Sequence, residues 1–192
     1  MPTKERIERI KTVLSHRKSD LRVVLEDVKN AHNASAVVRT CDAVGVQYID
    51  IISNEQTPFP VNDAISTKVE KWLEFNYHTS TKECLWSLKE QGFMIVATSL
   101  GEKTEHYTKP DYRQPAAFIF GNEKEGISDD ARARADYCIQ IPMLGMAQSL
   151  NLSVSVAVIL FEALRQREAD SAYQSVPLSK EEIDQFLAKW LE

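Results

Sequence analysis

The sequence lacks the hydrophobic segments that place a protein in or across a membrane. Its longest uninterrupted apolar run covers residues 156–161, whereas a transmembrane helix needs about 20 such residues. The first residues do not combine a basic stretch with the apolar run of a secretory signal peptide. We therefore expect a cytoplasmic protein without a membrane partner.

Cysteine is scarce, and the common motifs for metals and nucleotides are missing. The 192 residues include three cysteines, Cys41, Cys84 and Cys138, without a CxxC spacing. This pattern favours reduced, mostly buried thiols over a disulfide framework or a zinc site. The sequence also has no HExxH, EF-hand, GxxxxGK[ST] or GxGxxG motif. No metal is predicted, and the phosphate-loop and dinucleotide-binding classes lose support.

Positive charge is in the minority, but it is concentrated near the amino terminus. The chain has 23 Lys and Arg against 28 Asp and Glu, a net charge of −5. Residues 1–40 hold nine basic and five acidic residues, a balance of +4. A local basic face can bind phosphates even on an acidic protein. A solvated amphipathic helix would give the same count, so composition leaves both interpretations open.

Hydrophobic periodicity predicts helices and strands in alternation. Residues 3–15 have helical spacing, and residues 21–28 read as a short strand. Asn33 is a candidate N-cap for a helix that runs to about Val44 and ends at Gly45. Further strands are predicted at 46–52, 72–79, 93–100, 116–121 and 137–142, and further helices at 64–71, 81–92, 128–135, from 151 onward and at 178–191.

This alternation indicates an α/β fold with a mostly parallel sheet and helices on both faces. A hydrophobic content of 43% suits one compact domain with helical extensions at its two ends. Such sheets bind ligands beyond the carboxyl ends of their strands. The loops after Leu100, Gly121 and Ile141 are therefore the candidate ligand-binding loops.

Three stretches concentrate residues suited to chemistry. In the first, NASAVVRTCDAVG at 33–45, Asn33 and Arg39 lie about 120° apart around a helix. A capping asparagine and a solvated arginine would give the same pattern. In the second, FIFGNEKEGIS at 118–128, Gly121 and Gly126 allow a ligand or another backbone segment to come close. An ordinary strand-to-helix loop with surface acids is the alternative.

The third stretch, IPMLGMAQSLNLSVSVAVILFEALRQR at 141–167, joins a polar loop to an apolar helix. Ser149 or Asn151 can cap that helix and leave its first amide donors facing a cleft. A firmly buried helix with a polar mouth is a rigid support for a binding site.

Together and in this order, the three stretches resemble the three motifs of the SpoU branch of the SPOUT methyltransferases. The resemblance covers about residues 3–168 and implies a deep trefoil knot, S-adenosylmethionine as methyl donor and a homodimer. The chain length and terminal helices are most similar to the branch members that methylate the 2′-hydroxyl of a D-loop guanosine, at position 18 of tRNA. The implied division is 1–20 as a helical extension, 21–168 as the methyltransferase domain and 169–192 as a second extension.

The resemblance also implies roles for individual residues. The implied catalytic residues are Asn33, Arg39, Glu123, Ser149 and Asn151. The implied cofactor-binding residues are Thr98, Leu100, Gly121, Ile141, Met143, Gly145 and Leu150. Free guanidinium has a pKa above about 12, so we expect Arg39 to clamp a phosphate rather than to act as a base.

We expect tRNA, and not DNA, to bind the basic amino-terminal segment. The expected contacts are Lys4, Arg6, Arg9, Lys11, Arg17, Lys18 and Arg22, with the segment around Arg17 the most exposed. A ribosomal-RNA methyltransferase of the same branch is one alternative, but such enzymes commonly carry a separate RNA-binding domain before the knot, and about 20 residues precede the first strand. A non-catalytic RNA-binding protein is the other alternative, although such a protein would be expected to lose Arg39, Glu123 or Asn151.

Overall fold

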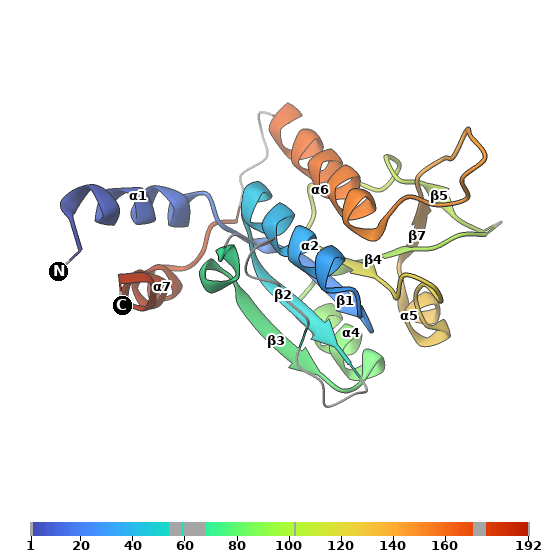
Figure 1. Cartoon of the computed structure of the whole chain (residues 1–192), viewed down its shortest axis with the longest axis horizontal. Coiled ribbons are helices and arrows are strands. Elements are labelled where there is room, and N and C mark those ends of the chain that lie inside the picture. The colour runs from blue at the N-terminus through green and yellow to red at the C-terminus, as the bar shows by residue number, and fades with distance from the viewer. Residues whose placement is uncertain (1, 54–58, 60–67, 102, 171–175, 192) are drawn as a thin grey trace.

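The computed structural model describes residues 2–53, 59, 68–101, 103–170 and 176–191. Its centre is a seven-stranded sheet in the order β3-β2-β1-β6-β4-β7-β5, in which all neighbouring strands are parallel (Figure 1). The strands are β1 (Lys18–Glu26), β2 (Val46–Ile52), β3 (Glu74–His78), β4 (Met94–Thr98), β5 (Glu105–His106), β6 (Ala116–Phe120) and β7 (Tyr137–Gln140). The predicted α/β class with a mostly parallel sheet is confirmed.

Helices cover both faces of the sheet. They are α1 (Lys4–Ser15), α2 (Ala31–Val44), the short 3-10 helix η1 (Val69–Trp72), α4 (Thr81–Glu90), α5 (Asp129–Arg134), α6 (Leu152–Ala169) and α7 (Lys180–Leu191). Apolar side chains of α2 and α6 pack on one face of β1, and those of α4 and α5 pack on the other. Strand β6 is therefore buried along its whole length, as expected for a central parallel strand.

The terminal helices α1 and α7 form a small unit beside this layered body. Ile10 and Leu14 of α1 pack against Phe186 and Trp190 of α7 in a separate hydrophobic cluster. Figure 1 shows the two helices side by side at one end of the molecule, with both chain termini close to them. The amino end of α7 has the predicted capping box, in which Ser179 N donates to the Glu182 carboxylate at 2.7 Å and Glu182 N donates to Ser179 Oγ at 3.2 Å.

Most of the predicted elements are present, with a few corrections. Strand β1 begins at Lys18 rather than at residue 21, and the two-residue strand β5 was not predicted. The helix predicted at 64–71 lies mostly outside the described residues. Gly45 ends α2 in the left-handed region, at φ 82°, as predicted. None of the described helices is long and apolar enough to cross a membrane.

The predicted N-cap of α2 was wrong. Asn30 caps this helix, because its side chain accepts hydrogen bonds from the backbone N–H groups of His32 and Asn33 at 2.9 and 3.2 Å. Asn33 therefore lies within the first turn, where its own side chain is free to bond elsewhere.

Candidate active site

A cavity of about 580 Å³ opens at the carboxyl ends of β4, β6 and β7. This is the edge of a parallel sheet at which ligands bind, and the volume lies within the usual range for small-molecule sites. The loops after Thr98, Phe120 and Gln140 line the cavity, as does the first half of α6. Six of the seven residues predicted to bind the cofactor lie on its lining, and only Gly145 does not; the six are Thr98, Leu100, Gly121, Ile141, Met143 and Leu150.

Three of the predicted catalytic residues form a hydrogen-bonded chain at the rim of this cavity. Asn33 Nδ2 donates to Glu123 Oε1 at 3.1 Å, and Asn33 Oδ1 accepts from Asn151 Nδ2 at 2.9 Å. Asn151 Oδ1 in turn accepts from the backbone N–H and the hydroxyl of Ser153, at 2.9 and 2.7 Å. The backbone N–H of Asn30 also donates to Glu123 Oε1 at 3.3 Å. Each amide in the chain thus has one fixed orientation, and Glu123 is held by the start of α2.

The loop that carries Glu123 is fixed by close packing. Gly121 has no room for a side chain, because a Cβ atom there would lie 2.1 Å from the carbonyl carbon of Gly126. The loop closes through a hydrogen bond of 2.8 Å from Gly126 N to Asn122 O. This observation confirms the prediction that Gly121 permits a close approach, and the approaching group is backbone.

A buried carboxylate ties the far end of the same loop to the sheet. Glu26, at the end of β1, is 3% exposed and accepts hydrogen bonds from the backbone N–H and the hydroxyl of Ser128 at 2.8 and 2.7 Å. Its Oε1 also accepts from the Thr81 hydroxyl at 2.5 Å. Ser128 is the N-cap of α5, so Glu26 fixes the start of that helix and the loop before it.

The two other predicted catalytic residues are placed differently. Ser149 lies on the cavity lining. Arg39 is exposed on α2, is absent from the lining and has no ion pair within the described part of the chain. It is six residues after Asn33, so its side chain points about 120° away around the helix. One copy of the chain therefore does not bring Arg39 to its own cavity.

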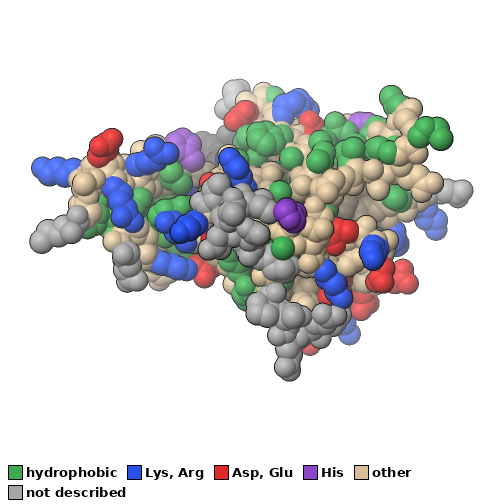
Figure 2. Space-filling view, viewed as in Figure 1, with side chains coloured by type: hydrophobic (Ala, Val, Ile, Leu, Met, Phe, Trp, Pro, Cys, Tyr) green, Lys and Arg blue, Asp and Glu red, His purple; other side chains and the backbone are tan. Residues whose placement is uncertain are grey.

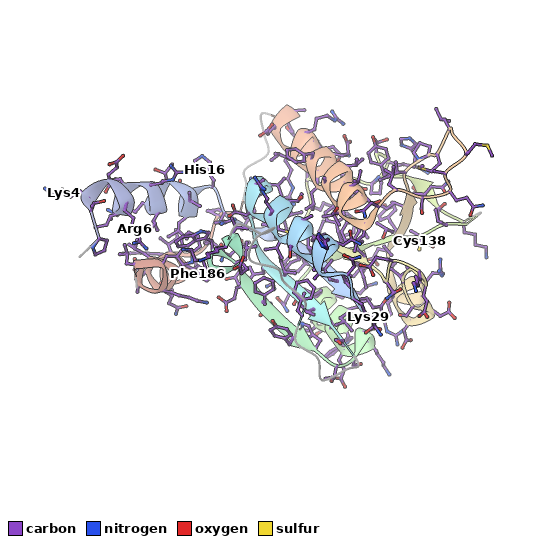
Figure 3. All side chains as sticks on the ribbon, viewed as in Figure 1. Lys4, Arg6, His16, Lys29, Cys138 and Phe186 are labelled. Atoms are coloured by element: carbon purple, nitrogen blue, oxygen red, sulfur yellow. The ribbon has the colours of Figure 1, made fainter. Side chains whose placement is uncertain are left out.

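The side chains predicted to bind RNA are only partly on the surface. Lys4, Arg6, Arg9 and Lys11 are exposed along α1, where Figure 2 shows Lys and Arg side chains gathered. Figure 3 places Lys4, Arg6 and His16 along α1 and Phe186 of α7 beside them. Lys18 is half-buried, and burial lowers the pKa of its ammonium group. Arg22 bonds to Asp50 at 3.4 Å and lies over the Tyr48 ring, 4.4 Å from the ring centroid.

The prediction that Arg17 is exposed was wrong. Its side chain is 1% exposed and makes an ion pair with Asp42. It also donates to the carbonyls of Asp42, Val46 and Trp72 at 3.2–3.4 Å, and its guanidinium lies 5.5 Å from the Trp190 ring centroid. Arg17 therefore joins α2, β2 and η1 to α7, and it is not available to a phosphate.

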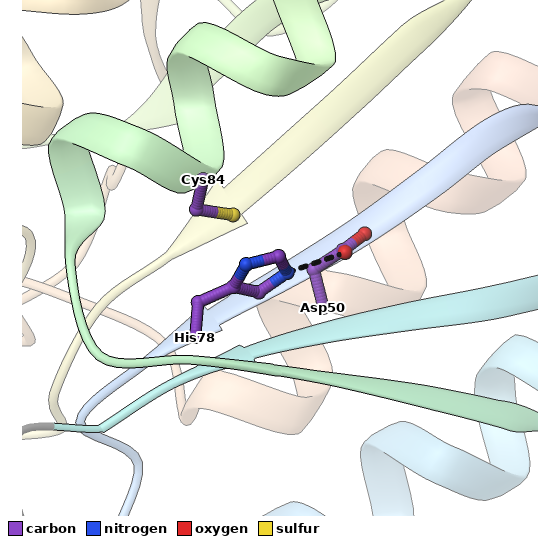
Figure 4. A group of neighbouring side chains, drawn as sticks. All are labelled: Asp50, His78 and Cys84. Carbon is purple, nitrogen blue, oxygen red and sulfur yellow. Dashed lines mark hydrogen bonds and ion pairs between the residues drawn. The ribbon is translucent and has the colours of Figure 1, made fainter.

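Asp50, His78 and Cys84 gather on the α4 side of the sheet and are the described residues with the composition of a metal site (Figure 4). Asp50 is already well bonded, since His78 Nε2 lies 2.9 Å from its Oδ1 and Asn76 donates to the same atom at 3.2 Å. Burial raises the pKa of the Cys84 thiol to about 12, and Arg22 adds a positive charge at Asp50. A dication would have to displace both the thiol proton and the arginine, so the cluster is better described as a hydrogen-bonded support for β3.

Asn30 and Glu26 are two contributors to the site that sequence reasoning missed. Asn30 is three residues before Asn33, and either asparagine satisfies the local rule for an N-cap. Glu26 ends a strand-like run, and its burial depends on Ser128, which is 102 residues later in the sequence. The sequence offered a signal only for Glu26, which is an acidic residue at the carboxyl end of a predicted strand.

Comparison with known proteins agrees with this geometry. A model of the SpoU rRNA Methylase family matches residues 20–161. The tRNA (guanosine(18)-2′-O)-methyltransferases of Aquifex aeolicus and Thermus thermophilus are 42% and 45% identical to this chain. The alignments cover 97% and 98% of this chain, and 88% and 97% of those two proteins.

Solved structures are also similar. The A. aeolicus TrmH/SpoU tRNA modifying enzyme superimposes with a TM-score of 0.91 at 42% identity, over 97% of this chain and 95% of that one. An AdoMet-bound rRNA methyltransferase from Sinorhizobium meliloti superimposes with a TM-score of 0.67 at 26% identity, over 81% of this chain and 59% of that one. On the family match and the two near-full-length relatives, this chain belongs to the SpoU methylase family.

Proposed function

We propose that the protein transfers a methyl group from S-adenosylmethionine to the ribose 2′-hydroxyl of guanosine 18 in the D-loop of tRNA. The observation that carries this proposal is how much of the chain aligns with the tRNA-methylating relatives. The family match ends at residue 161, whereas the tRNA-methylating relatives align over 97–98% of the chain and therefore include most of α1 and α7. The terminal helices are the elements that we expect to set the choice of RNA.

The cavity suits S-adenosylmethionine. Leu100, Ile141 and Leu150 offer apolar walls to a purine, and the ends of three strands offer backbone polar groups to its edge. The sulfonium of this molecule supplies an electrophilic methyl group. We assign the six lining residues named above to its binding, and Gly145 only to the shape of the loop.

The chain's own polar residues act on the ribose. A 2′-hydroxyl is a weak nucleophile until it gives up its proton, so the site must stabilise the developing oxyanion. The second carboxylate oxygen of Glu123 is left to accept from that hydroxyl, because Asn33 and Asn30 bind the first. Ser149 on the lining donates to the ribose, and Asn151 keeps Asn33 in the orientation that Glu123 needs.

We further propose that two copies share each active site and that Arg39 of one copy clamps a tRNA phosphate at the cavity of the other. Large apolar side chains are exposed on the loop before α6 and on α6 itself: Leu144 at 100%, Met146 at 101%, Val154 at 46% and Phe161 at 51%. Figure 2 shows a band of hydrophobic side chains over this region. A continuous apolar face of this kind fits an interface between identical copies, and α2, which carries Arg39, packs beside α6.

The trefoil knot and the division at residues 20 and 168 belong to the same proposal. They are supported by the meeting of three loops, after β4, β6 and β7, at one cavity, and by the separate hydrophobic cluster that α1 forms with α7.

The test is methylation of unfractionated tRNA and of ribosomal RNA, with the modified nucleotide mapped by primer extension. We expect 2′-O-methylguanosine at position 18 of tRNA. Arg39→Ala should keep the fold and donor binding but lose about a hundredfold in single-turnover rate, equivalent to roughly 3 kcal/mol of transition-state stabilisation. Methylation of ribosomal RNA alone, or a normal rate for Arg39→Ala, contradicts the proposal.

Mixing two impaired variants tests the shared site. Arg39→Ala and Glu123→Ala should each be strongly impaired alone. If every site takes Arg39 from one copy and Glu123 from the other, an exchanged equal mixture regains about a quarter of the wild-type activity, because half of the dimers have one intact site. Sites built within single copies would leave the mixture impaired.

A further inference from the structure

A cation on the cavity wall has no role in the mechanism above. Arg132 of α5 lies on the lining of the cavity, and its Nη1 donates a hydrogen bond to the hydroxyl of Ser99, just after β4. Its Nε lies 3.9 Å from Asp129, whose side chain is fully exposed, so that ion pair is weak. The guanidinium thus keeps most of its hydrogen-bonding capacity and is directed to the cavity by Ser99.

The other charged residues on the lining, Glu123, Lys124 and Glu125, all lie on the loop after β6. Glu123 is bound to Asn33 and to the backbone of Asn30. The backbone N–H groups of Lys124 and Glu125 bind Asn122 Oδ1, which fixes the turn that carries them. Arg132 is on a different element, α5, and its guanidinium is bound to Ser99 just after β4. The cavity therefore has Glu123 on its α2 side and a separately held positive group on its α5 side.

S-adenosylmethionine has one part that an arginine favours. Its purine and ribose are neutral, and its sulfonium and amino groups are positive. Its carboxylate is negative, and a planar guanidinium matches a carboxylate with two parallel hydrogen bonds. We propose that Arg132 binds the carboxylate of the methyl donor and that Ser99 positions the guanidinium for it. This inference rests on the proposed function.

The assignment also orients the donor. With the carboxylate at Arg132, the positive sulfonium would be favoured on the side of the cavity where Glu123 lies. Arg132 is therefore a specificity-determining residue for the amino-acid part of the donor.

Calorimetric titration of the full-length protein with two ligands tests this inference. The ligands are S-adenosylmethionine and its decarboxylated form, which differs only in the carboxylate. Wild type should prefer S-adenosylmethionine. Arg132→Gln should lose about 10- to 100-fold in affinity for S-adenosylmethionine, the usual effect of removing a hydrogen-bonded charge partner, with little change for the decarboxylated ligand. Ser99→Ala should lose less, in the same ligand-selective way.

Arg134→Gln is the matched control, because Arg134 is on the same helix, is paired with Asp130 at 3.1 Å and is not on the cavity lining. It should bind both ligands like wild type. An equal loss for both ligands in Arg132→Gln, or no loss for either, overturns the inference. If wild-type protein binds neither ligand, the proposed function fails instead.

Discussion

Arg17 offers the sharpest test of how this structure uses positive charge. Its guanidinium is buried and pairs with Asp42, whose side chain is 29% exposed. Removing one partner of a buried ion pair costs about 3–5 kcal/mol, because the other charge is left uncompensated. The partial exposure of Asp42 favours the lower end, so we expect Arg17→Ala to lose about 3 kcal/mol of unfolding free energy. For a domain of this size, that loss lowers Tm by about 6–12 °C.

The matched control is Arg9→Ala. Arg9 is exposed on α1 and has no ion pair within the described residues. This variant should keep the wild-type Tm but weaken tRNA binding and reduce the salt slope of log K by about one. Circular dichroism melts and filter binding of tRNA over a range of salt concentrations measure both effects. If Arg17→Ala keeps the Tm and instead reduces the salt slope, Arg17 faces the RNA and our interpretation of its burial is wrong.

Three further substitutions test local packing and charge, two at the site and one at the start of α7. Gly121→Ala should lower the unfolding free energy by at least about 1–3 kcal/mol, because its Cβ would overlap the Gly126 backbone. It should also weaken S-adenosylmethionine binding in calorimetry. Gly145→Ala is the control, because its Cβ has open space and the substitution should be neutral. Glu26→Gln should cost about 1.5–3 kcal/mol, since three donors lose a charged acceptor. Glu182→Gln should flatten the fall in Tm between neutral and acidic pH.

The acid effect follows from the direction of the Glu182 shift. Burial opposes ionisation, but hydrogen bonds from the Tyr48 hydroxyl and from Ser179 outweigh it and lower the pKa of this carboxyl group. Its stabilisation is complete above the ordinary carboxyl pKa and is lost as pH falls through the lowered value. An unchanged pH profile for Glu182→Gln would contradict this assignment. A neutral Glu26→Gln, or equal effects of the two glycine substitutions, would contradict the other two.

Rules of hydrophobic periodicity and helix capping predicted the helices and strands whose signals lie within a few neighbouring residues. The strand Val46–Ile52 and the caps Ser128 and Ser179 were predicted because periodicity and capping act over a few residues. The cap of α2 was misplaced for a tertiary reason: Asn33 is used by Glu123, 90 residues later in the sequence. Strand β5 has two residues, which is too short for a periodic pattern.

The sequence predicted where the site lies in the fold, but not which of its side chains would bond to one another. Loops at the carboxyl ends of parallel strands were expected to bind a ligand, and the cavity lies there. Spacing alone did not show that Asn151 and Asn33, 118 residues apart, would share a hydrogen bond. The burial of Arg17 was missed because its partners Asp42 and Trp190 are distant in sequence, and a row of basic residues looks solvated until its partners are known.

The contact between Arg17 and Trp190 also sets the order in which a newly made chain reaches its final form. Trp190 follows all seven strands of the sheet in the sequence and is therefore synthesised after them. The sheet can assemble while synthesis continues, since amino-terminal segments fold first. Ile10 and Leu14 lack the cover of Phe186 and Trp190 until α7 has been synthesised. A chain in which α7 has not yet been synthesised therefore exposes an apolar face of α1 that α7 later covers.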